Sequence, residues 1–472
     1  MMGLVNYPLI WERAALQDIM VHIIGGDWGK EPEYLDEGYL SVFCIRGSEF
    51  KDWNNNFGKT AVERKIKSSS LEKRELVDGD ILVEISGGGP EQPVGRTVLI
   101  EKKVLKQLCL PVVGTNFLRL MRPLHYVSSS FVNRYLEFFY KSGEVVKYQG
   151  GSNNLRNLKF KEYSAIEIPV PSALEQKIIA DKLDTLLAQV DSAKARLEQI
   201  PQILKRFRQA VLASAVSRRL IPKDQKSNVR FDVSVGSLCI TSFDGPFGSK
   251  LKTDDYTNTG VRVARLENIG HLTFNDEKET YISDTKFNSL KGNKIEKDDV
   301  LFSSFVDEDV RVCLFPHNDK IFINKADCFC LRINQEKASP KYVALTLASR
   351  TSYEQIKAQV QGVTRPRINL KTLRSLSFPF PSLQEQNEIV RRVEQLFAYA
   401  DGIEKQVQNA LECVNNLTQS ILAKAFRGEL TAQWRAENPD LISGENSAQE
   451  LLAKIQQQRK STKTIKRSKG NS

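Results

Sequence analysis

Apolar residues recur at alternating spacings of four and three along two long segments of the chain. The first segment runs from Ile179 to Val211 and the second from Ile389 to Ile421. This spacing lines one side of an α-helix with apolar side chains and is typical of a coiled-coil seam. The sequence therefore predicts two long helices whose apolar stripes need a partner. The seam residues that we assign are Leu183, Leu186, Val190, Leu197, Leu204, Val393, Leu396, Ile403, Val407 and Leu417.

The two helical segments are copies of each other at an offset of 210 residues. Pro169-Val-Pro-Ser-Ala-Leu-Glu-Gln176 aligns with Pro379-Phe-Pro-Ser-Leu-Gln-Glu-Gln386. The regions before the helices repeat more loosely, since Asp80-Ile-Leu aligns with Asp299-Val-Leu at an offset of 219. A repeat on this scale indicates a tandem duplication, in the order variable domain, helix, variable domain, helix.

Each apolar stripe could be buried against its own domain, against a partner subunit or against the other helix. The matched length and register of the two copies favour the other helix. The connection between them is long enough for either orientation, but an antiparallel pair gives two equivalent units related by a pseudo-twofold axis. Pro201 lies inside the first seam, so we expect that helix to kink or restart near Ile200.

The variable regions carry short alternating apolar runs, such as Ile81-Leu-Val83, separated by turn residues, together with helical stretches. This pattern predicts an α+β domain in each copy. The expected organisation is a first variable domain, a central helix, a second variable domain, a C-terminal helix and a basic, flexible tail. The corresponding ranges are 1–168, 169–221, 222–378, 379–430 and 431–472.

Each helix is preceded by a signal for a helix start. The segment P-x-P keeps the chain extended, and Ser172 or Ser382 then stands three residues before Glu175 or Glu385. This S-x-x-E pattern predicts a capping box.

Composition and charge limit the classes of partner and of location that we expect for this chain. Lys and Arg exceed Asp and Glu by 11, with a pI near 9.1, which favours a polyanionic partner such as nucleic acid. No run is long and apolar enough for a membrane span, and no secretory signal precedes one, so we expect a cytosolic protein without a membrane partner. The seven cysteines are scattered without a C-x-x-C pair, which indicates buried free thiols.

The sequence lacks motifs for chemistry of its own. It has no G-x-x-x-x-G-K-[ST] phosphate loop and no Asp/Asn-Pro-Pro-Tyr/Phe segment of the adenine methyltransferases. The four histidines have no partner at metal-ligand spacing. We therefore expect no catalytic residue, no metal site and no cofactor in this chain.

DNA-reading candidates are long cationic side chains on the loops of the variable domains. Arginine can bridge guanine O6 and N7, whereas lysine mainly neutralises phosphate. Any single one of them could equally be an ordinary solvated charge. The strongest segment is Gln361-Gly-Val-Thr-Arg-Pro-Arg367, where a proline-fixed turn carries two arginines. The candidates are Arg46, Lys51, Arg96, Lys250, Arg265, Arg311, Arg365 and Arg367.

This plan resembles the specificity subunit of type I restriction-modification systems over nearly the whole chain. The most specific pieces are Ile166-Glu-Ile-Pro-Val-Pro-Ser-Ala-Leu-Glu-Gln176 and Gln199-Ile-Pro-Gln-Ile-Leu-Lys-Arg-Phe-Arg-Gln-Ala210, the latter similar to the A-type enterobacterial branch. Phe243-Asp-Gly-Pro-Phe-Gly-Ser-Lys250 resembles the loop that begins many target-recognition domains. The first domain has Ile24-Gly-Gly-Asp27 in the comparable place, which leaves the role of that loop open.

The resemblance implies a non-catalytic subunit in which each target-recognition domain reads one half of a bipartite double-stranded DNA target. It also implies two modification subunits and restriction subunits as partners, with S-adenosylmethionine, ATP and Mg bound by those partners. Glu175, Gln176, Glu385 and Gln386 would be docking points for these subunits. The alternative function is a coiled-coil scaffold whose variable domains bind protein.

Overall fold

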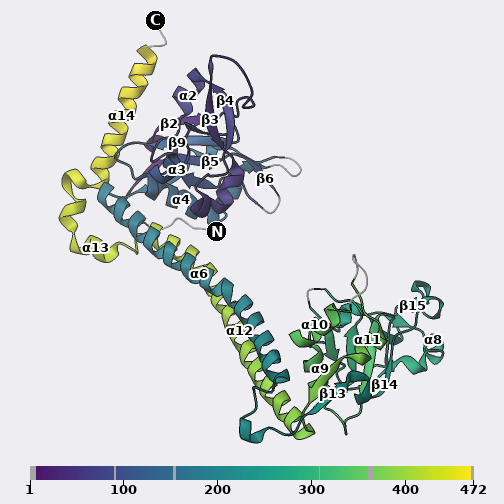
Figure 1. Ribbon diagram of the computed structural model, residues 1–472. Helices are drawn as coiled ribbons and strands as arrows, with labels where there is room; N and C mark the ends of the chain where they lie inside the picture. Colours follow the sequence, from purple (N-terminus) through teal and green to yellow (C-terminus); the bar gives the residue numbers. More distant parts are fainter. Residues whose placement is uncertain (1–6, 90–91, 152–155, 308, 360–365, 469–472) are drawn as a thin grey trace. The chain divides into compact units, whose positions relative to one another are not determined.

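The structure of the chain, a computed structural model, describes residues 7–89, 92–151, 156–307, 309–359 and 366–468. It divides into two compact units, residues 1–196 with 410–472 and residues 197–409. The division runs through two long helices, α6 (Ala173–Val216) and α12 (Leu383–Phe426) (Figure 1). Each unit therefore combines one variable domain with one part of each long helix.

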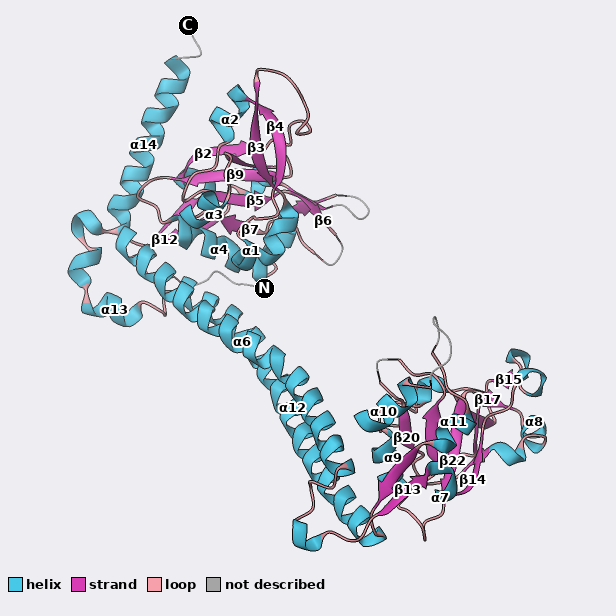
Figure 2. Ribbon diagram, in the orientation of Figure 1, coloured by secondary structure: helices cyan, strands magenta, loops and turns pink. Residues whose placement is uncertain are grey.

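The first unit holds an α+β domain built on two sheets (Figure 2). Its main sheet is antiparallel, in the order β2-β9-β5-β7, and its second sheet, β4-β3-β8, contains a parallel β3–β8 pair. Strands β1 and β12 pair where the domain joins the long helix. The strands are β1 (Glu12–Ala15), β2 (Met20–Gly25), β3 (Tyr39–Ile45), β4 (Val62–Lys67), β5 (Ile81–Glu84), β6 (Ser86–Gly88), β7 (Thr97–Leu99), β8 (Val112–Gly114), β9 (Leu118–Pro123), β10 (Gln149–Gly150), β11 (Arg156–Leu158) and β12 (Glu167–Val170).

Helix α4 joins this domain to the long helices. The aromatic side chains of Phe131, Tyr135 and Phe138 pack around Phe426 of α12, with ring centroids 5.1–5.6 Å apart. Aromatic clusters of this kind bury a large apolar area in one place. The helices of this unit besides α6 and α12 are α1 (Trp53–Asn56), α2 (Ser68–Arg74), α3 (Lys102–Gln107), α4 (Ser129–Lys141), α5 (Phe160–Tyr163), α13 (Ala432–Glu437) and α14 (Ala448–Ser468).

The second unit repeats this architecture. Its main sheet is β14-β22-β19-β20, its second sheet is β15-β17-β16-β21-β18 with a parallel β16–β21 pair, and β13 pairs with β23. The elements are β13 (Arg230–Ser234), α7 (Val235–Leu238), β14 (Cys239–Phe243), β15 (Tyr256–Thr257), β16 (Val261–Ala264), β17 (Tyr281–Ile282), α8 (Asp284–Asn288), β18 (Lys294–Ile295), β19 (Val300–Ser303), β20 (Val312–Leu314), β21 (Phe322–Asn324), β22 (Cys328–Ile333), α9 (Pro340–Leu347), α10 (Arg350–Lys357), α11 (Leu370–Ser375) and β23 (Ser377–Phe380).

The two long helices pair with each other in antiparallel orientation, as the sequence predicted. In the first unit the start of α6 meets the end of α12, where Leu183 shares a core with Ile421 and Leu422. In the second unit the end of α6 meets the start of α12, and Arg208 bonds Asp401 and Glu404 at 2.6 and 2.8 Å. The structure also confirms the predicted tandem duplication and the α+β class of the domains.

One detail of the predicted seam is wrong. Leu417 is 46 % exposed, because the end of α12 turns Ile421, Leu422 and Phe426 toward the domain core instead. Of the two alternatives expected at Pro201, a kink or a restart, the structure rules out the restart, because α6 is continuous there. The other assigned seam residues are buried or partly buried.

The four residues predicted as docking points are buried inside the chain, at most 4 % exposed. Glu175 accepts hydrogen bonds from Trp11 Nε1 at 2.9 Å and Thr431 Oγ1 at 2.7 Å, and it pairs with Arg435. Glu385 accepts two bonds of 2.6 Å from Arg218. The capping box is thus only half formed, because each serine caps its helix but each glutamate bonds elsewhere.

The glutamines have an equally internal role. Gln176 accepts a bond of 2.9 Å from the backbone N–H of Ser128, the residue that caps α4, and donates to Pro171 O at 2.9 Å. Gln386 does the same with Ser339, at the start of α9, and with Pro381. We therefore correct the docking assignment: a buried, fully bonded side chain cannot meet a partner directly, and these residues fasten each domain to its long helix.

The two carboxylates form a reciprocal clasp. Glu175 begins α6 and is held by Thr431 and Arg435, which follow α12, whereas Glu385 begins α12 and is held by Arg218, which follows α6. Arg218 adopts a left-handed backbone (φ 58°) at the position where the other copy has Gly428 (φ 74°). Its strained conformation is retained because its guanidinium pairs with a buried carboxylate.

The segment after α12 differs from the predicted flexible tail. Residues 432–468 form α13 and α14, and Leu451 and Ile455 of α14 are buried in the core of the first unit. Arg459 pairs with Asp18, and Tyr126 bonds Gln458. Leu451 and Ile455, four positions apart, lie on the face of α14 that packs against the domain, and Leu452 packs beside them.

Burial at the helix pair leads to a first prediction. Leu183→Asp should lower the free energy of unfolding by several kcal/mol, because it places an unpaired charge in an apolar core. Leu417→Asp, which changes an exposed residue on the partner helix, should stay within about 0.5 kcal/mol of the parent. Urea unfolding followed by circular dichroism measures both, and equal losses in the two variants would contradict this pairing.

The clasp predicts a pH dependence. Burial raises the pKa of Glu385, but the bonds from Arg218 and Ser227 outweigh it and hold the pKa below its ordinary value. Its stabilising contribution is therefore present above the ordinary glutamate pKa and is lost as the pH falls through the lowered one. Glu385→Gln should remove this acid sensitivity and destabilise the protein by about 3 kcal/mol at pH 7.

The control for this pH series is Glu394→Gln, which removes a carboxylate of the same helix from an exposed pair with Lys341. It should change stability by less than about 1 kcal/mol. Unfolding midpoints at pH 7 and at steps down to about pH 2 give the comparison. An unchanged acid sensitivity in Glu385→Gln would show that the clasp carboxylate is not its source.

Candidate nucleic-acid interface

In the first domain the ends of β2, β3 and β5 and the start of β9 meet at one edge of the sheets. Backbone hydrogen bonds join them: Gly26 N–H donates to Leu118 O, Thr115 N–H to Ile45 O, and Ile85 N–H to Phe117 O. We call this surface the first edge. It comprises residues 25–27, 46–49, 84–86, 95–96 and 115–118.

The second domain has a matching second edge. Lys325 N–H donates to Ala264 O, and Ser304 N–H donates to Asp327 O, in the same positions as the bonds of the first edge. The second edge comprises residues 243–245, 265–268, 303–304, 311 and 325–328. The two domains thus present equivalent loops at equivalent strand ends.

The loop after β2, which contains Gly26 and Asp27, and the loop after β14 occupy equivalent places in the two domains. A Cβ on Gly26 would lie 2.1 Å from the carbonyl oxygens of Gly114 and Thr115, and one on Gly245 would lie 2.0 Å from the carbonyl carbon of Lys325. Only glycine permits so close an approach of two backbones. Both loops are therefore pressed against the turn that begins the neighbouring strand.

Two predicted readers, Arg46 and Arg96, lie side by side at the first edge. Arg46 follows β3 and bonds Glu49, with Nη2 at 2.6 Å from Oε1. Arg96 precedes β7 and bonds both oxygens of Glu84, at 2.9 and 2.6 Å, while its Nη2 donates to Gly47 O. Both glutamates are 2 % exposed, and their bonds raise the pKa of the two arginines.

Arg265 and Arg311 occupy the equivalent positions of the second edge. Arg265 follows β16 and pairs with Glu267 at 3.2 Å. Arg311 precedes β20, and its Nη1 donates to Leu266 O at 3.4 Å, as Arg96 does to Gly47 O. The structure thus brings together four of the predicted readers, two at each edge.

Arg367 also reaches the second edge. Its Nη1 lies 3.8 Å from the Asp327 carboxylate, and its guanidinium stands 4.9 Å from the ring centre of Phe305. Lys51 is exposed on the short turn that follows Arg46. Lys250 is exposed after the loop that follows β14. Arg365 lies outside the described residues.

A carboxylate with a shifted pKa lies at the second edge. Burial raises the pKa of Asp244 to about 6, against the bond from Gly245 N–H, and the nearby Asp327 carboxylate adds to the rise. Asp244 also accepts a bond of 3.0 Å from the backbone of Asp327. Its role is to hold the loop after β14 on the turn before β22.

The sequence alone does not reveal the residues that stand behind the arginines at the two edges. Glu49, Glu84, Asn268 and Ser303 look like ordinary polar residues in a linear sequence. The loose repeat contained the signal, because Glu49 and Asn268, and Glu84 and Ser303, align at the offset of 219 residues that relates the two domains.

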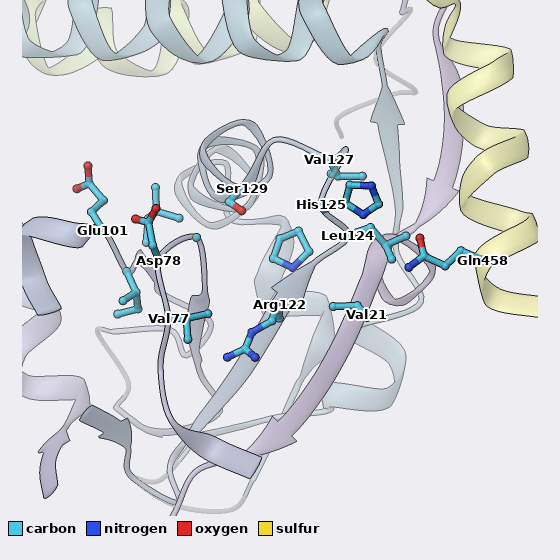
Figure 3. A pocket seen from close by; sticks show the side chains of 14 residues that line it. Val21, Val77, Asp78, Glu101, Arg122, Leu124, His125, Val127, Ser129 and Gln458 are labelled. Atoms are coloured by element: carbon cyan, nitrogen blue, oxygen red, sulfur yellow. The ribbon is translucent and has the colours of Figure 1, made fainter. Parts of the chain in front are cut away.

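A cavity of about 730 Å³ lies away from the first edge. It opens at the other end of β5, between the domain and α14, and Figure 3 shows Asp78, Glu101, Arg122 and Gln458 among its lining side chains. Arg122 is occupied by Asp80, at 2.7 Å. Asp78 and Glu101 pair with Lys102 and Lys103, so these charged side chains of the cavity already have partners, and we do not include it in the interface.

The described residues hold no cluster of three or more His, Cys, Asp or Glu side chains that could bind a metal ion. Among the same residues, no helix has the length and apolar character needed to cross a membrane.

Comparison with known proteins agrees with this arrangement. The model of the Type I restriction modification DNA specificity domain matches residues 11–202 and 245–413. The chain is 37 % identical to the StySPI specificity subunit of Salmonella potsdam and 37 % identical to the EcoKI specificity subunit of Escherichia coli K12. Each match covers 96 % of both proteins.

Solved structures show the same fold. A chain from a type I restriction-modification system matches with a TM-score of 0.64 at 16 % identity, covering 90 % of this chain and 99 % of that one. The HsdS subunit of Thermoanaerobacter tengcongensis matches with a TM-score of 0.54 at 16 % identity, covering 90 % and 98 %. The duplicated domains, the paired helices and the matched sequence lead to one conclusion: this chain belongs to the type I restriction-modification specificity subunit family.

Proposed function

We propose that this chain reads a bipartite DNA target, one half through each edge, and that it assembles the subunits that modify and cut DNA. The observation that carries the proposal is the repetition of one surface in both domains. Each edge presents two arginines at equivalent strand ends, Arg46 and Arg96 in one domain and Arg265 and Arg311 in the other. Arginine at a loop is the commonest reader of guanine.

The charge of the chain supports a nucleic-acid partner. A net charge of +11 favours the phosphate backbone, and Lys51, Lys250 and Arg367 add cations at or beside the two edges. The basic end of the chain after Lys460 would add affinity that does not depend on base sequence. A scaffold that binds only protein would need neither the charge nor the repeated arginine pairs.

The proposed domain limits follow the repeat. The target-recognition domains are residues 1–168 and 222–378, the conserved helices 169–221 and 379–430, and the C-terminal segment 431–472. Two modification subunits would dock on the two equivalent helix copies, with restriction subunits added to that complex. S-adenosylmethionine, ATP and Mg would be bound by these partners, and the complex would act in the cytoplasm.

Independent reading by the two domains predicts the result of a domain exchange. Residues 16–166, which lie between β1 and β12, are replaced by the matching segment of another family member. The chimera keeps Trp11 and the clasp of α6, so the domain should remain attached to its helix. The methylated motif should then change in one half only, because each domain reads its own half. Sequencing that detects methylated adenine in a host with the modification subunit measures the motif.

The reciprocal exchange of residues 235–376, between β13 and β23, is the matched control. It should change only the other half of the motif. A change in both halves from either exchange would contradict independent reading.

Assembly gives a further prediction. The isolated chain should neither methylate nor cleave DNA, and light scattering of the reconstituted methyltransferase should give two modification subunits per chain. The reason is that the duplicated helices offer two equivalent docking faces. A stable one-to-one complex that methylates both strands would refute the two-face argument.

A further inference from the structure

The two edges share their arginines but differ in the residues that hold them. Arg46 and Arg265 each begin a short turn, and in each case the backbone N–H of the arginine donates to the side chain three residues later. That side chain is Glu49 in the first domain and Asn268 in the second, and both are buried. The third position after the arginine therefore carries a buried carboxylate in one domain and a buried neutral amide in the other.

The second arginine of each edge shows the same contrast. Backbone bonds of 2.9 Å join Glu84 N–H to Arg96 O and Ser303 N–H to Arg311 O, so the two pairs are equivalent. Glu84 binds the Arg96 guanidinium through both oxygens. Ser303 does not reach it, and Arg311 Nε is buried with no hydrogen-bond partner in the described part of the chain.

The carboxylates leave a defined part of each guanidinium free at the first edge. The bonds of Arg46 and Arg96 come from Nε and Nη2, and among the described residues neither Nη1 group has a partner. The side chains of Arg46 and Arg96 are still 39 % and 20 % exposed. Each arginine can thus donate from Nη1 to a ligand in solvent while the buried carboxylate fixes the orientation of its guanidinium.

Fixed orientation is what separates base reading from phosphate binding. An arginine that reads a base must meet acceptors at set positions on the base edge, whereas a phosphate contact tolerates many orientations. A buried carboxylate bound to two guanidinium nitrogens removes rotational freedom before DNA arrives.

We propose that Glu49 and Glu84 are positioning residues that orient Arg46 and Arg96 toward base acceptors in one half of the DNA target. At the second edge the carboxylates near the arginines are not buried: Glu267 pairs with Arg265 at 3.2 Å and the exposed Asp307 lies 3.9 Å from Arg311, so these arginines are not held from the core in the same way. This inference rests on the proposed function, because it assumes that the first edge contacts DNA.

The test maps methylated adenine in a host that carries the modification subunit and either the parent chain, Glu84→Gln or Arg96→Lys. Glu84→Gln keeps the shape but removes the charge, and Arg96→Lys keeps the charge but removes the planar guanidinium. Each variant should lose discrimination at a base pair in the first half of the motif by about tenfold or more. The second half should stay as in the parent.

The matched control is Asp80→Asn. Asp80 is a buried carboxylate bound to Arg122 by two bonds, and it stands at the other end of the strand that carries Glu84. This variant should lower the melting temperature as Glu84→Gln does but leave the motif unchanged. Relaxation of the same base pair by Asp80→Asn would show a general loss of stability and would overturn the inference.

Other outcomes are equally decisive. An unchanged first half in both edge variants, or loss of methylation together with loss of the folded chain by circular dichroism, would show that the two arginines serve the fold and not base reading. Relaxation in Glu84→Gln supports the positioning role, whereas relaxation in Arg96→Lys alone would show that Arg96 reads a base without Glu84 and would overturn the inference. If the parent chain itself gives no bipartite motif, the proposed function fails, whereas a bipartite parent motif with unchanged variants overturns only this inference.

Discussion

The buried carboxylate at the start of each long helix is the constraint on which the rest of the structure depends. Glu175 and Glu385 are nearly inaccessible to solvent, and a buried carboxylate is stable only when a cation and hydrogen-bond donors surround it. In each case the cation follows the end of the other helix. A helix of 44 residues spans about 66 Å, so a parallel pair would keep both carboxylates far from their arginines. The clasp therefore specifies the antiparallel pairing that the apolar stripes alone leave open.

A shared scaffold with exchangeable readers follows from this arrangement. Gln176 and Gln386 fasten each domain through the backbone of one capping serine, so the attachment does not depend on the side chains at the edges. The edges are then free to differ. Glu84 in one copy and Ser303 in the other occupy equivalent positions, yet only the first holds an arginine. Duplication can thus keep the framework and change the surface that recognises DNA.

The sequence predicted the features that repeat with a period or align between copies. The two helices, their antiparallel pairing and the α+β domains are of this kind. It did not predict that Leu417 turns outward, because a straight helix drifts away from a strict seven-residue repeat where a domain core competes for its side chains. Nor could it show that Glu175 is internal, since its partner Arg435 lies far along the chain. The terminal helix was missed because Leu451 and Ile455 stand in a highly polar run.

The central claim is that one chain with two equivalent edges reads one split DNA target. The measurement that tests it most directly is a map of methylated adenine across the DNA of a host that contains this chain, its modification subunit and no other methyltransferase. The account predicts a single motif with two specified halves and a gap of constant length. A continuous motif, or two halves found at variable separation, would contradict it.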